Sequence, residues 1–250
     1  QAELDNTLRD LLGEDSAPAA RLVNEDEFRP FDNDYTIQQA SDALITSLEV
    51  LADQVAERVT SDPARRAALV PCTPASAGDA ACFRTFLESF LPRAFRRATT
   101  EAEVDAFLPL LSFASEDNAV VENDFYTAVR LAVSAAVQDP ELLYRIESGT
   151  PGSEPGLVEL DGFALASRMS YLLWATMPDD TLFAAAASGA LTTSDGRRAE
   201  ALRMLDDPKA RGQLHRFHAM WLGYRSIPHT PELVAAFNRE TSALIDRVIF

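Results

Sequence analysis

The sequence has little glycine, few basic residues and no long apolar run, and each shortage excludes something. Only 10 of the 250 residues are glycine, while alanine and leucine are abundant, which favours helices over a glycine-rich β architecture. No stretch approaches the ~20 apolar residues of a membrane-spanning helix, so we expect no transmembrane segment. No signal peptide is visible at the start of the chain.

The shortage of basic residues makes the chain strongly acidic. It has 22 Lys and Arg against 39 Asp and Glu, which gives a formal net charge of -17 at pH 7. Such a charge repels nucleic-acid phosphates and anionic membrane surfaces, so no nucleic-acid partner is expected. Arg93, Arg96 and Arg97 form the densest basic cluster. At the end of a helix, such arginines are more often dipole complements and ion-pair donors than a nucleic-acid site.

Only two cysteines occur, Cys72 and Cys82. Their spacing is wrong for a CxxC redox pair or a zinc knuckle, and two thiols alone cannot make a structural zinc site. They bracket one short flexible loop, which favours a local disulfide in an oxidising compartment over two free thiols in a cytosolic protein. Loop-closure entropy predicts a stabilisation of roughly 2–3 kcal/mol from this bond.

Motifs of common catalytic chemistry are also missing. We find no P-loop, GxGxxG, GxSxG or HExxH sequence, and no CxxCH for covalent attachment of haem. Asp179 and Asp180 are interpreted as helix-capping residues rather than a general acid–base pair. Asp32 and Asp34 resemble part of a calcium loop, but the glycine and bidentate glutamate of an EF-hand do not follow.

What the sequence does contain is one amphipathic helical pattern after another. Leu44, Leu48, Leu51 and Val55 recur at helical spacing on one predicted helix. Helix starts are indicated by Asp and Pro pairs and by a capping box. These start signals are Thr100 with Glu103, Asp139-Pro140, Asp161, Asp207-Pro208 and Pro231. No alternating run predicts a strand of any length, so we predict an all-α, multi-helix body of orthogonal or bundle-like packing.

A segment rich in Gly, Ser and Pro, SGTPGSEPG at 148–156, is the clearest predicted linker. It divides the chain into an N-terminal helical region, 1–148, with the cysteine loop 72–82, and a C-terminal helical region, 157–250. These would be two packed subdomains. The chain begins inside one helical pattern and ends inside another, so we expect it to continue beyond residue 250 as part of a longer protein.

The one pattern that suggests a cofactor is RGQLHRFHAMWLG at 211–223. On a helix, His215 and His218 lie on nearly the same face and are candidate ligands of a transition metal or a haem iron. The alternative is that they are polar residues at the edge of an apolar face. We prefer that alternative, because a histidine at the edge of an apolar face is more often a hydrogen-bonded core or boundary residue than a ligand.

Several stretches together resemble a known group of proteins. They are LDNTLRDLLG, FLESFLPRAFRRATTEAEV, DPELLYRIESG, LDGFALASRMSYLLWATMPDDTLFAAAASGAL, RMLDDPKA and FHAMWLG. The chain resembles large exported multi-domain proteins of unknown function from planctomycetes and myxobacteria, which often carry or are fused to cytochrome c-like CxxCH modules. The resemblance transfers no catalytic residue. Arg168 matches its motifs and, among apolar neighbours in mid-helix, is a candidate for a core ion pair.

The resemblance implies a haem-associated electron-transfer or oxidoreductase protein, exported to the periplasm, cell surface or outside of the cell. In that interpretation this segment binds no cofactor, and haem c lies elsewhere in the full-length protein. Its partner would be the remainder of its own polypeptide or a cytochrome-like module. The alternatives are a non-catalytic helical scaffold or interaction module, and an enzyme acting on extracellular polymers with its site in another segment. The oligomeric state is not predicted.

Overall fold

The computed structural model describes residues 1–22, 31, 41–147, 149–152, 154–224 and 227–250. Nearly all of its regular structure is helical, which confirms the predicted all-α class. The helices before residue 148 are α1 (Ala2–Leu12), α2 (Ala19–Leu22), α3 (Asp42–Ser61), α4 (Pro63–Leu69), α5 (Ala80–Phe95), α6 (Glu101–Phe107), α7 (Pro109–Ser115), α8 (Phe125–Gln138) and α9 (Pro140–Leu143). The later elements are β1 (Gly149–Pro151), β2 (Val158–Leu160), α10 (Gly162–Trp174), α11 (Asp180–Ala187), the 3-10 helix η1 (Ala190–Thr192), α12 (Ser194–Leu205), α13 (Pro208–Trp221) and α14 (Pro231–Ile249).

The predicted helix starts are the observed ones. The side chains of Asp139, Asp161 and Asp207 accept hydrogen bonds from the first free backbone amides of α9, α10 and α13. Thr100 and Glu103 form the complete capping box at the start of α6. These caps satisfy amide groups that have no partner inside the helix, which is why the start of each helix could be located from local sequence.

A strand within the predicted linker pairs with a strand just after it in a short antiparallel ladder, which the sequence did not indicate. β1 pairs with β2 so that Gly149 lies opposite Leu160 and Pro151 opposite Val158. A Cβ atom at Gly149 would lie 2.2 Å from the carbonyl oxygen of Glu159, so the strands approach this closely only because residue 149 is glycine. Three-residue strands are too short for a visible alternation of polar and apolar residues.

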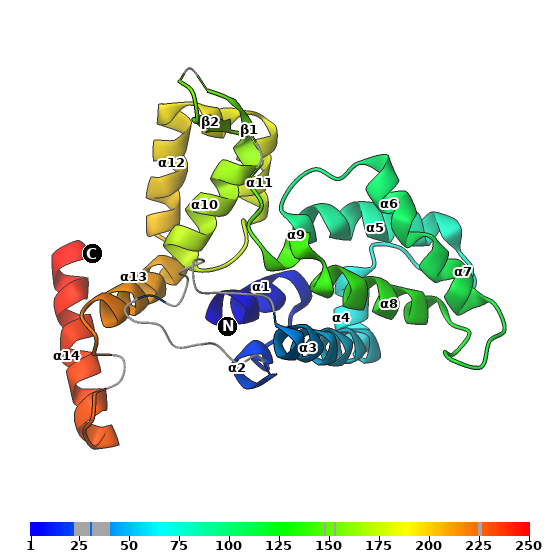
Figure 1. Ribbon diagram of the computed structural model, residues 1–250, viewed down its shortest axis with the longest axis horizontal. Helices are drawn as coiled ribbons and strands as arrows, with labels where there is room; N and C mark the ends of the chain where they lie inside the picture. Colours follow the sequence, from blue (N-terminus) through cyan, green and yellow to red (C-terminus); the bar gives the residue numbers. More distant parts are fainter. Residues whose placement is uncertain (23–30, 32–40, 148, 153, 225–226) are drawn as a thin grey trace.

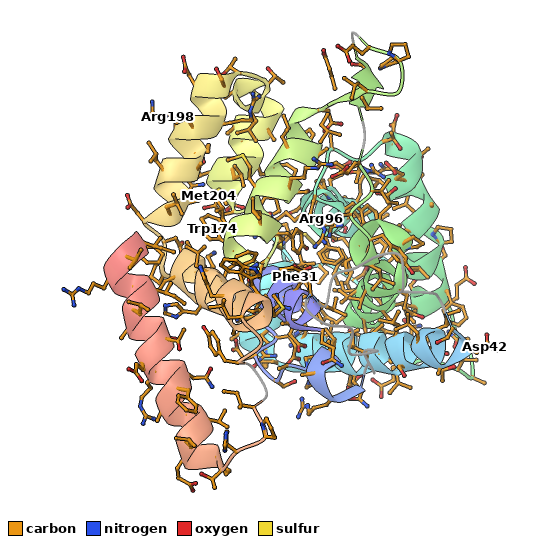
Figure 2. The ribbon with its side chains drawn as sticks, turned by 60° about the vertical axis from the view of Figure 1, so that its left-hand side comes forward. Phe31, Asp42, Arg96, Trp174, Arg198 and Met204 are labelled. Atoms are coloured by element: carbon orange, nitrogen blue, oxygen red, sulfur yellow. A yellow bond between two sulfur atoms is a disulfide. The ribbon has the colours of Figure 1, made fainter. Side chains whose placement is uncertain are left out.

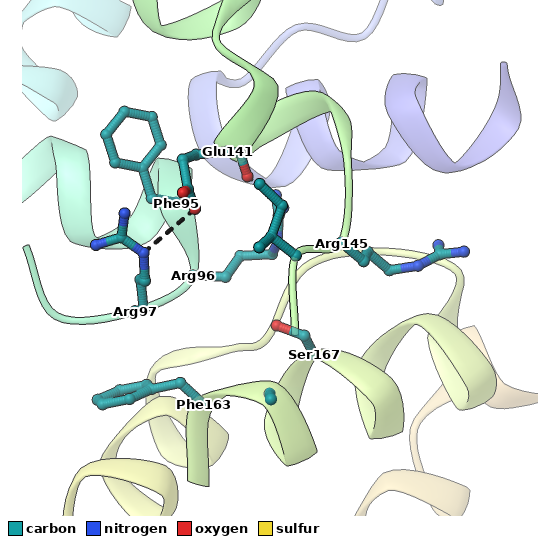
Figure 3. Close-up of a pocket in the computed structure, with 9 residues that line it drawn as sticks. Phe95, Arg96, Arg97, Glu141, Arg145, Phe163 and Ser167 are labelled. Atoms are coloured by element: carbon teal, nitrogen blue, oxygen red, sulfur yellow. Dashed lines mark hydrogen bonds and ion pairs between the residues drawn. The ribbon is translucent and has the colours of Figure 1, made fainter. Parts of the chain in front are cut away.

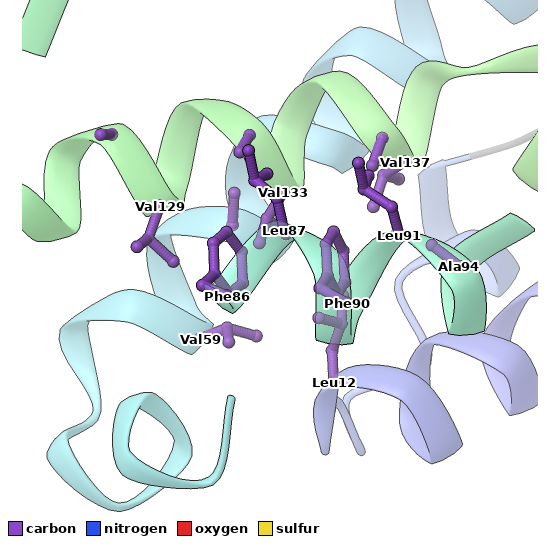
Figure 4. Close-up of a cluster of buried hydrophobic side chains, with 14 of the residues drawn as sticks. Leu12, Val59, Phe86, Leu87, Phe90, Leu91, Ala94, Val129, Val133 and Val137 are labelled. Atoms are coloured by element: carbon purple, nitrogen blue, oxygen red, sulfur yellow. The ribbon is translucent and has the colours of Figure 1, made fainter. Parts of the chain in front are cut away.

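The larger of two hydrophobic clusters is built by helices α1–α9. Helices α3 and α8 pack along each other, and α5 adds a row of phenylalanines. Figure 4 shows Phe86 and Phe90 stacked between Val59 and Leu12 on one side and the valines of α8 on the other. Phe86 is completely buried and Phe90 almost so. Burial of this aromatic row contributes substantially to the stability of the N-terminal part.

The second cluster is smaller and lies among α10–α13. Its buried members are Ala166, Trp174, Leu182, Ala186, Leu191, Met204 and Ala210. The indole Nε1 of Trp174 donates a hydrogen bond to the carbonyl oxygen of Met204 at 2.9 Å (Figure 2). Cations lie over the same ring, since Lys209 Nζ is 4.3 Å and Arg203 Cζ 5.5 Å from its centroid. Trp174 therefore contacts its neighbours through its ring face as well as through its indole N–H.

A polar seam joins the two clusters, with α1 between them (Figure 1). The Tyr171 hydroxyl of α10 lies 2.8 Å from the Thr7 hydroxyl of α1. Asn6 donates to the carbonyl oxygen of Ala175, and Thr176 donates to Asp10. The two clusters thus meet through hydrogen bonds rather than through a shared apolar core. The division at 148 and 157 remains a prediction, and this seam and the separate clusters are consistent with it.

None of the helices in the described ranges is both long and apolar enough to cross a lipid bilayer. The longest of them, α3 and α14, are amphipathic, with charged residues along their lengths.

Candidate functional site

The segment with the two histidines forms helix α13 and is followed by α14. Asp207 caps α13 and Pro208 occupies its first turn. The helix ends at Trp221, and Gly223 adopts a left-handed conformation with φ of 72° in the turn that follows. Pro231 then begins α14, which buries only Ile245 among its side chains. In Figures 1 and 2, α14 lies at the outer edge of the molecule and α13 lies between it and the rest of the chain.

His215 connects α13 to α14. Its Nε2 lies 2.8 Å from a carboxylate oxygen of Asp246. Arg211, one turn earlier on α13, lies 3.5 Å from the same carboxylate oxygen, and its guanidinium is 4.9 Å from the centroid of the Phe250 ring. Because a carboxylate can only accept a hydrogen bond, Nε2 of His215 carries the proton and donates this hydrogen bond to Asp246. This nitrogen is therefore not available to bind a metal ion. This side of His215 is a structural contact between the two helices.

His218 is held differently. Its Nδ1 lies 2.7 Å from the carbonyl oxygen of Leu214, one turn earlier on the same helix. A carbonyl oxygen only accepts, so Nδ1 carries the proton and Nε2 of the neutral ring keeps its lone pair. That is the tautomer in which a histidine binds a metal ion.

Aromatic rings surround His218. Phe217 and Trp221 share one face of α13, with ring centroids 6.1 Å apart, and both rings pack against the imidazole at 5.3 and 6.0 Å. Phe31, from the N-terminal part, stacks on Phe217 at 5.7 Å. Trp221 nevertheless remains 58% exposed and Phe217 40%. We call Phe31, Phe217, His218 and Trp221 the α13 aromatic cluster. It is an exposed apolar surface of a composition typical of protein contacts.

Two polar atoms close to this cluster are buried without a hydrogen-bond partner among the described residues. They are Oε1 of Gln213 and the hydroxyl of Tyr224. Burial raises the pKa of the Tyr224 phenol. Unsatisfied polar atoms of this kind are rare in complete interiors.

The two candidate ligand residues are close in sequence but are not oriented toward one another. In the described ranges, no group of three or more His, Cys, Asp or Glu side chains is placed to hold a metal ion. A ligand role for His215 and His218 remains a prediction. The geometry favours His218, because Nε2 of His215 is bonded to Asp246, whereas Nε2 of His218 has no such bond. Asp32 and Asp34, the weak calcium candidates, lie outside the described residues.

The structure joins the two cysteines. Cys72 and Cys82 form a disulfide with an S–S distance of 2.08 Å, across the loop that leads into α5. Asp79 orders the same loop, because its carboxylate accepts from the amides of Ala75 and Cys82. These amides lower the pKa of Asp79. The loop is therefore closed by one covalent bond and one set of backbone hydrogen bonds.

Arg168 does form an ion pair, but the expectation of a core position was wrong. Its guanidinium makes a two-fold contact with the Glu147 carboxylate, with Nη2 to Oε2 at 2.8 Å. The Arg168 side chain is 61% exposed. Arg168 and Leu172 lie on the same solvent-exposed face of α10. The apolar neighbours of Arg168 in the sequence could not indicate which face of the helix would be exposed. The bond to Arg168 lowers the pKa of Glu147.

The arginine cluster after α5 is structural, as expected, but Arg96 does more than complement a helix dipole. Arg96 is buried and donates to the carbonyl oxygens of Glu141, Leu142 and Tyr144. Arg97 binds Glu103 and Glu141. Figure 3 shows these side chains around a cavity of about 10 Å³, which is room for a single water molecule and too small for a cofactor.

Comparison with known proteins matches three consecutive segments to families of unknown function. Residues 1–61 match PSD3 (DUF1587), residues 82–147 match PSD5 (DUF1595) and residues 160–249 match PSD4 (DUF1592). No curated protein and no solved structure matches the chain. The matches are consistent with a multi-domain protein of unknown function. The α13 aromatic cluster and α14 both lie in the PSD4-like segment, apart from Phe31.

Proposed function

We propose that this chain is the helical frame of an exported electron-transfer or oxidoreductase protein whose haem is bound outside this segment. In this proposal a cytochrome c-like module, either from the remainder of the same polypeptide or a separate protein, docks on the α13 aromatic cluster. The observation that carries it is the exposure of Phe217 and Trp221 beside a histidine whose Nε2 is uncommitted. Trp is among the residues that dominate binding energy at protein interfaces, and Phe is enriched in their buried centres.

Two further observations support the proposal. The disulfide between Cys72 and Cys82 fits a protein that matures in an oxidising compartment such as the periplasm or the cell exterior. The reason for including a haem in the proposal is the resemblance to exported proteins that carry CxxCH modules. When bound, haem c contributes one-electron chemistry, and the residues of this chain would contribute contact surface and exclusion of water.

The test compares the naturally produced full-length protein with this segment, by absorbance spectroscopy and metal analysis. We expect a Soret band in the full-length protein alone. In the full-length protein, Trp221→Ala should keep the haem but slow electron delivery to a redox dye at least tenfold. Leu172→Ala, an equally exposed apolar residue on α10, is the matched control and should leave the rate unchanged.

Two results would contradict the proposal. Absence of haem from the full-length protein would remove the redox function. A Soret band or bound metal in the segment itself, lost in His218→Ala and kept in His229→Ala, would place the cofactor on this chain. Thiol labelling of the purified protein before and after reduction checks the compartment, because an exported chain should label only after reduction.

The second candidate is a non-catalytic scaffold or interaction module of an extracellular or cell-surface assembly. The observation that favours it is an apolar face of α14 that no other described part of the chain covers, where Leu244 and Val248 are exposed to solvent. A full-length protein that transfers electrons to a dye would count against this candidate, whereas an inactive, haem-free protein that assembles would support it.

A further inference from the structure

Helix α14 has two apolar faces, and only one of them has a partner in the described chain. Ile245 lies on the first face and is buried, and the adjacent Asp246 contacts His215 of α13. The second face carries Leu233, Phe237, Leu244 and Val248, which are 40%, 39%, 61% and 75% exposed. At 100° per residue these four side chains fall within a sector of about 60°. We call them the α14 stripe.

The spacing of the stripe is symmetric about its centre. Successive members are four, seven and four residues apart, so the midpoint falls between Glu240 and Thr241. If two α14 helices lie antiparallel, Leu233 of one helix meets Val248 of the other, and Phe237 meets Leu244. A two-fold interface requires such a self-complementary surface, and the stripe provides it over about 22 Å of helix.

The distribution of charge also favours contact between copies at this place. Residues 190–250 contain nine basic residues (Lys and Arg) and seven acidic residues (Asp and Glu). Residues 1–189 contain thirteen basic and thirty-two acidic residues. Two copies that met through the N-terminal part would bring two strongly negative surfaces together. The C-terminal part is nearly neutral, so copies can approach there without that repulsion.

From the symmetry of the stripe, its exposure and the local neutrality, we propose that two copies of this chain associate through antiparallel pairing of their α14 helices. With these exposures, the four apolar side chains of each copy can bury only about 400 Å², or about 800 Å² in total, which lies below the range of standard specific interfaces. The dimer is accordingly weak, with a Kd on the order of micromolar.

Sedimentation velocity over about 1–100 µM tests the association. The average mass should rise with concentration from that of one 27.3 kDa chain toward that of two. Leu244→Glu should weaken the dimer at least tenfold, because it places two carboxylates in an apolar contact. Leu172→Glu, at a 72% exposed position of α10, is the matched control and should not change the mass. Circular dichroism and the melting temperature check that both variants fold.

Cysteine crosslinking tests the antiparallel geometry. The two native cysteines are joined to each other, so single introduced thiols can be followed separately. A mixture of Leu233→Cys and Val248→Cys chains should crosslink on oxidation, while each variant alone should crosslink far less. Crosslinking of each variant with itself would indicate parallel helices and overturn the geometry.

A chain that stays monomeric at every concentration would overturn the inference, as would burial of the stripe by another segment of the full-length protein. The inference does not rest on the proposed function. A haem-containing monomer would contradict the dimer alone, and a haem-free dimer would contradict the redox function alone.

Discussion

Arg96 occupies a backbone conformation that a residue with a side chain rarely adopts. Its φ of 57° ends helix α5 in the left-handed region. The guanidinium lies in the interior and donates to four carbonyl oxygens, three of which belong to the segment around α9. Charge-assisted hydrogen bonds of this kind outweigh the backbone cost of about 1 kcal/mol. Arg96 therefore fastens α9 to the end of α5.

Replacement of Arg96 should be strongly destabilising. Arg96→Ala leaves several buried carbonyl groups without a donor, so the free energy of unfolding should fall by about 3 kcal/mol. The loss of unfolding free energy should be about 1 kcal/mol smaller for Arg96→Gly, because glycine adopts the left-handed conformation without strain. Urea denaturation measures both. Arg93→Ala, at an exposed position one turn earlier, is the control and should change stability by less than about 0.5 kcal/mol. Equal losses for Ala and Gly would contradict the backbone argument.

Glu103 should make the stability of the protein depend on acid pH. A hydrogen bond from Arg97, aided by the Thr100 amide, lowers the pKa of Glu103 to about 2. Because this pKa is below its value in the unfolded chain, the ionised side chain stabilises the fold above about pH 4.5. That contribution is lost as the pH falls from about 4.5 toward 2.

Glu103→Gln should therefore remove part of this acid sensitivity. At pH 7 the variant should unfold about 1–2 kcal/mol more easily, a figure reduced for the partial exposure of the pair. Its stability should then fall less steeply than that of the natural protein between pH 4.5 and 2. Denaturant titrations at several pH values measure this, with Glu101→Gln on the same helical turn as the control. Parallel pH profiles for the natural protein and Glu103→Gln would refute the assignment.

At the scale of elements, the disulfide loop should support the start of α5. The bond closes a loop between residues ten apart, and its removal should cost roughly 2–3 kcal/mol of unfolding free energy. Cys72→Ser with Cys82→Ser should still fold, because Asp79 continues to cap α5. Thermal melts with and without reductant measure the effect. Reductant should lower the melting temperature of the natural protein and leave that of the double variant unchanged, and sensitivity of the double variant would show another cause.

The elements show which features local sequence can predict. Asp–Pro starts and the capping box depend on residues within one turn, so α6, α9 and α13 were predicted at their observed starts. The β1–β2 hairpin was missed because it depends on a close approach of backbones at Gly149.

The candidate site was predicted only in part. The helix carrying His215 and His218 was expected, but their separate partners, Asp246 and the Leu214 carbonyl, depend on α14 and on ring orientation. The burial of Arg96 and the exposure of Arg168 depend on which neighbouring element covers each side chain, and periodicity within a single helix carries no such information. The signal for the α14 stripe, its four, seven and four spacing, was present in the sequence. It could be interpreted only after the burial of Ile245 and the contact of Asp246 with His215 had shown which side of α14 the described chain covers.

At the scale of the molecule, the two hydrophobic clusters differ in what they can support alone. The N-terminal cluster buries a row of large side chains on α5, including Phe83, Phe86 and Phe90. Three of the seven buried members of the C-terminal cluster are alanines, so it gains less from burial per residue. The seam between the clusters is polar, and among the described residues the N-terminal cluster draws no apolar residue from beyond Leu143.

The fragment 1–148 should therefore fold alone, while 157–250 should not reach the same stability without it. We expect a cooperative thermal transition for 1–148 and a broader transition at lower temperature for 157–250, measured by circular dichroism. Mixing the two should raise the lower transition, because Asn6, Thr7 and Asp10 regain their partners on α10 and in the turn after it. Tyr171→Phe in the second fragment should weaken this effect by about 1 kcal/mol, since it removes one buried hydrogen bond of the seam. If neither fragment folds separately, the boundary at 148–157 divides a single cooperative unit, and the hydrogen bonds of the seam contribute more to stability than the smaller core.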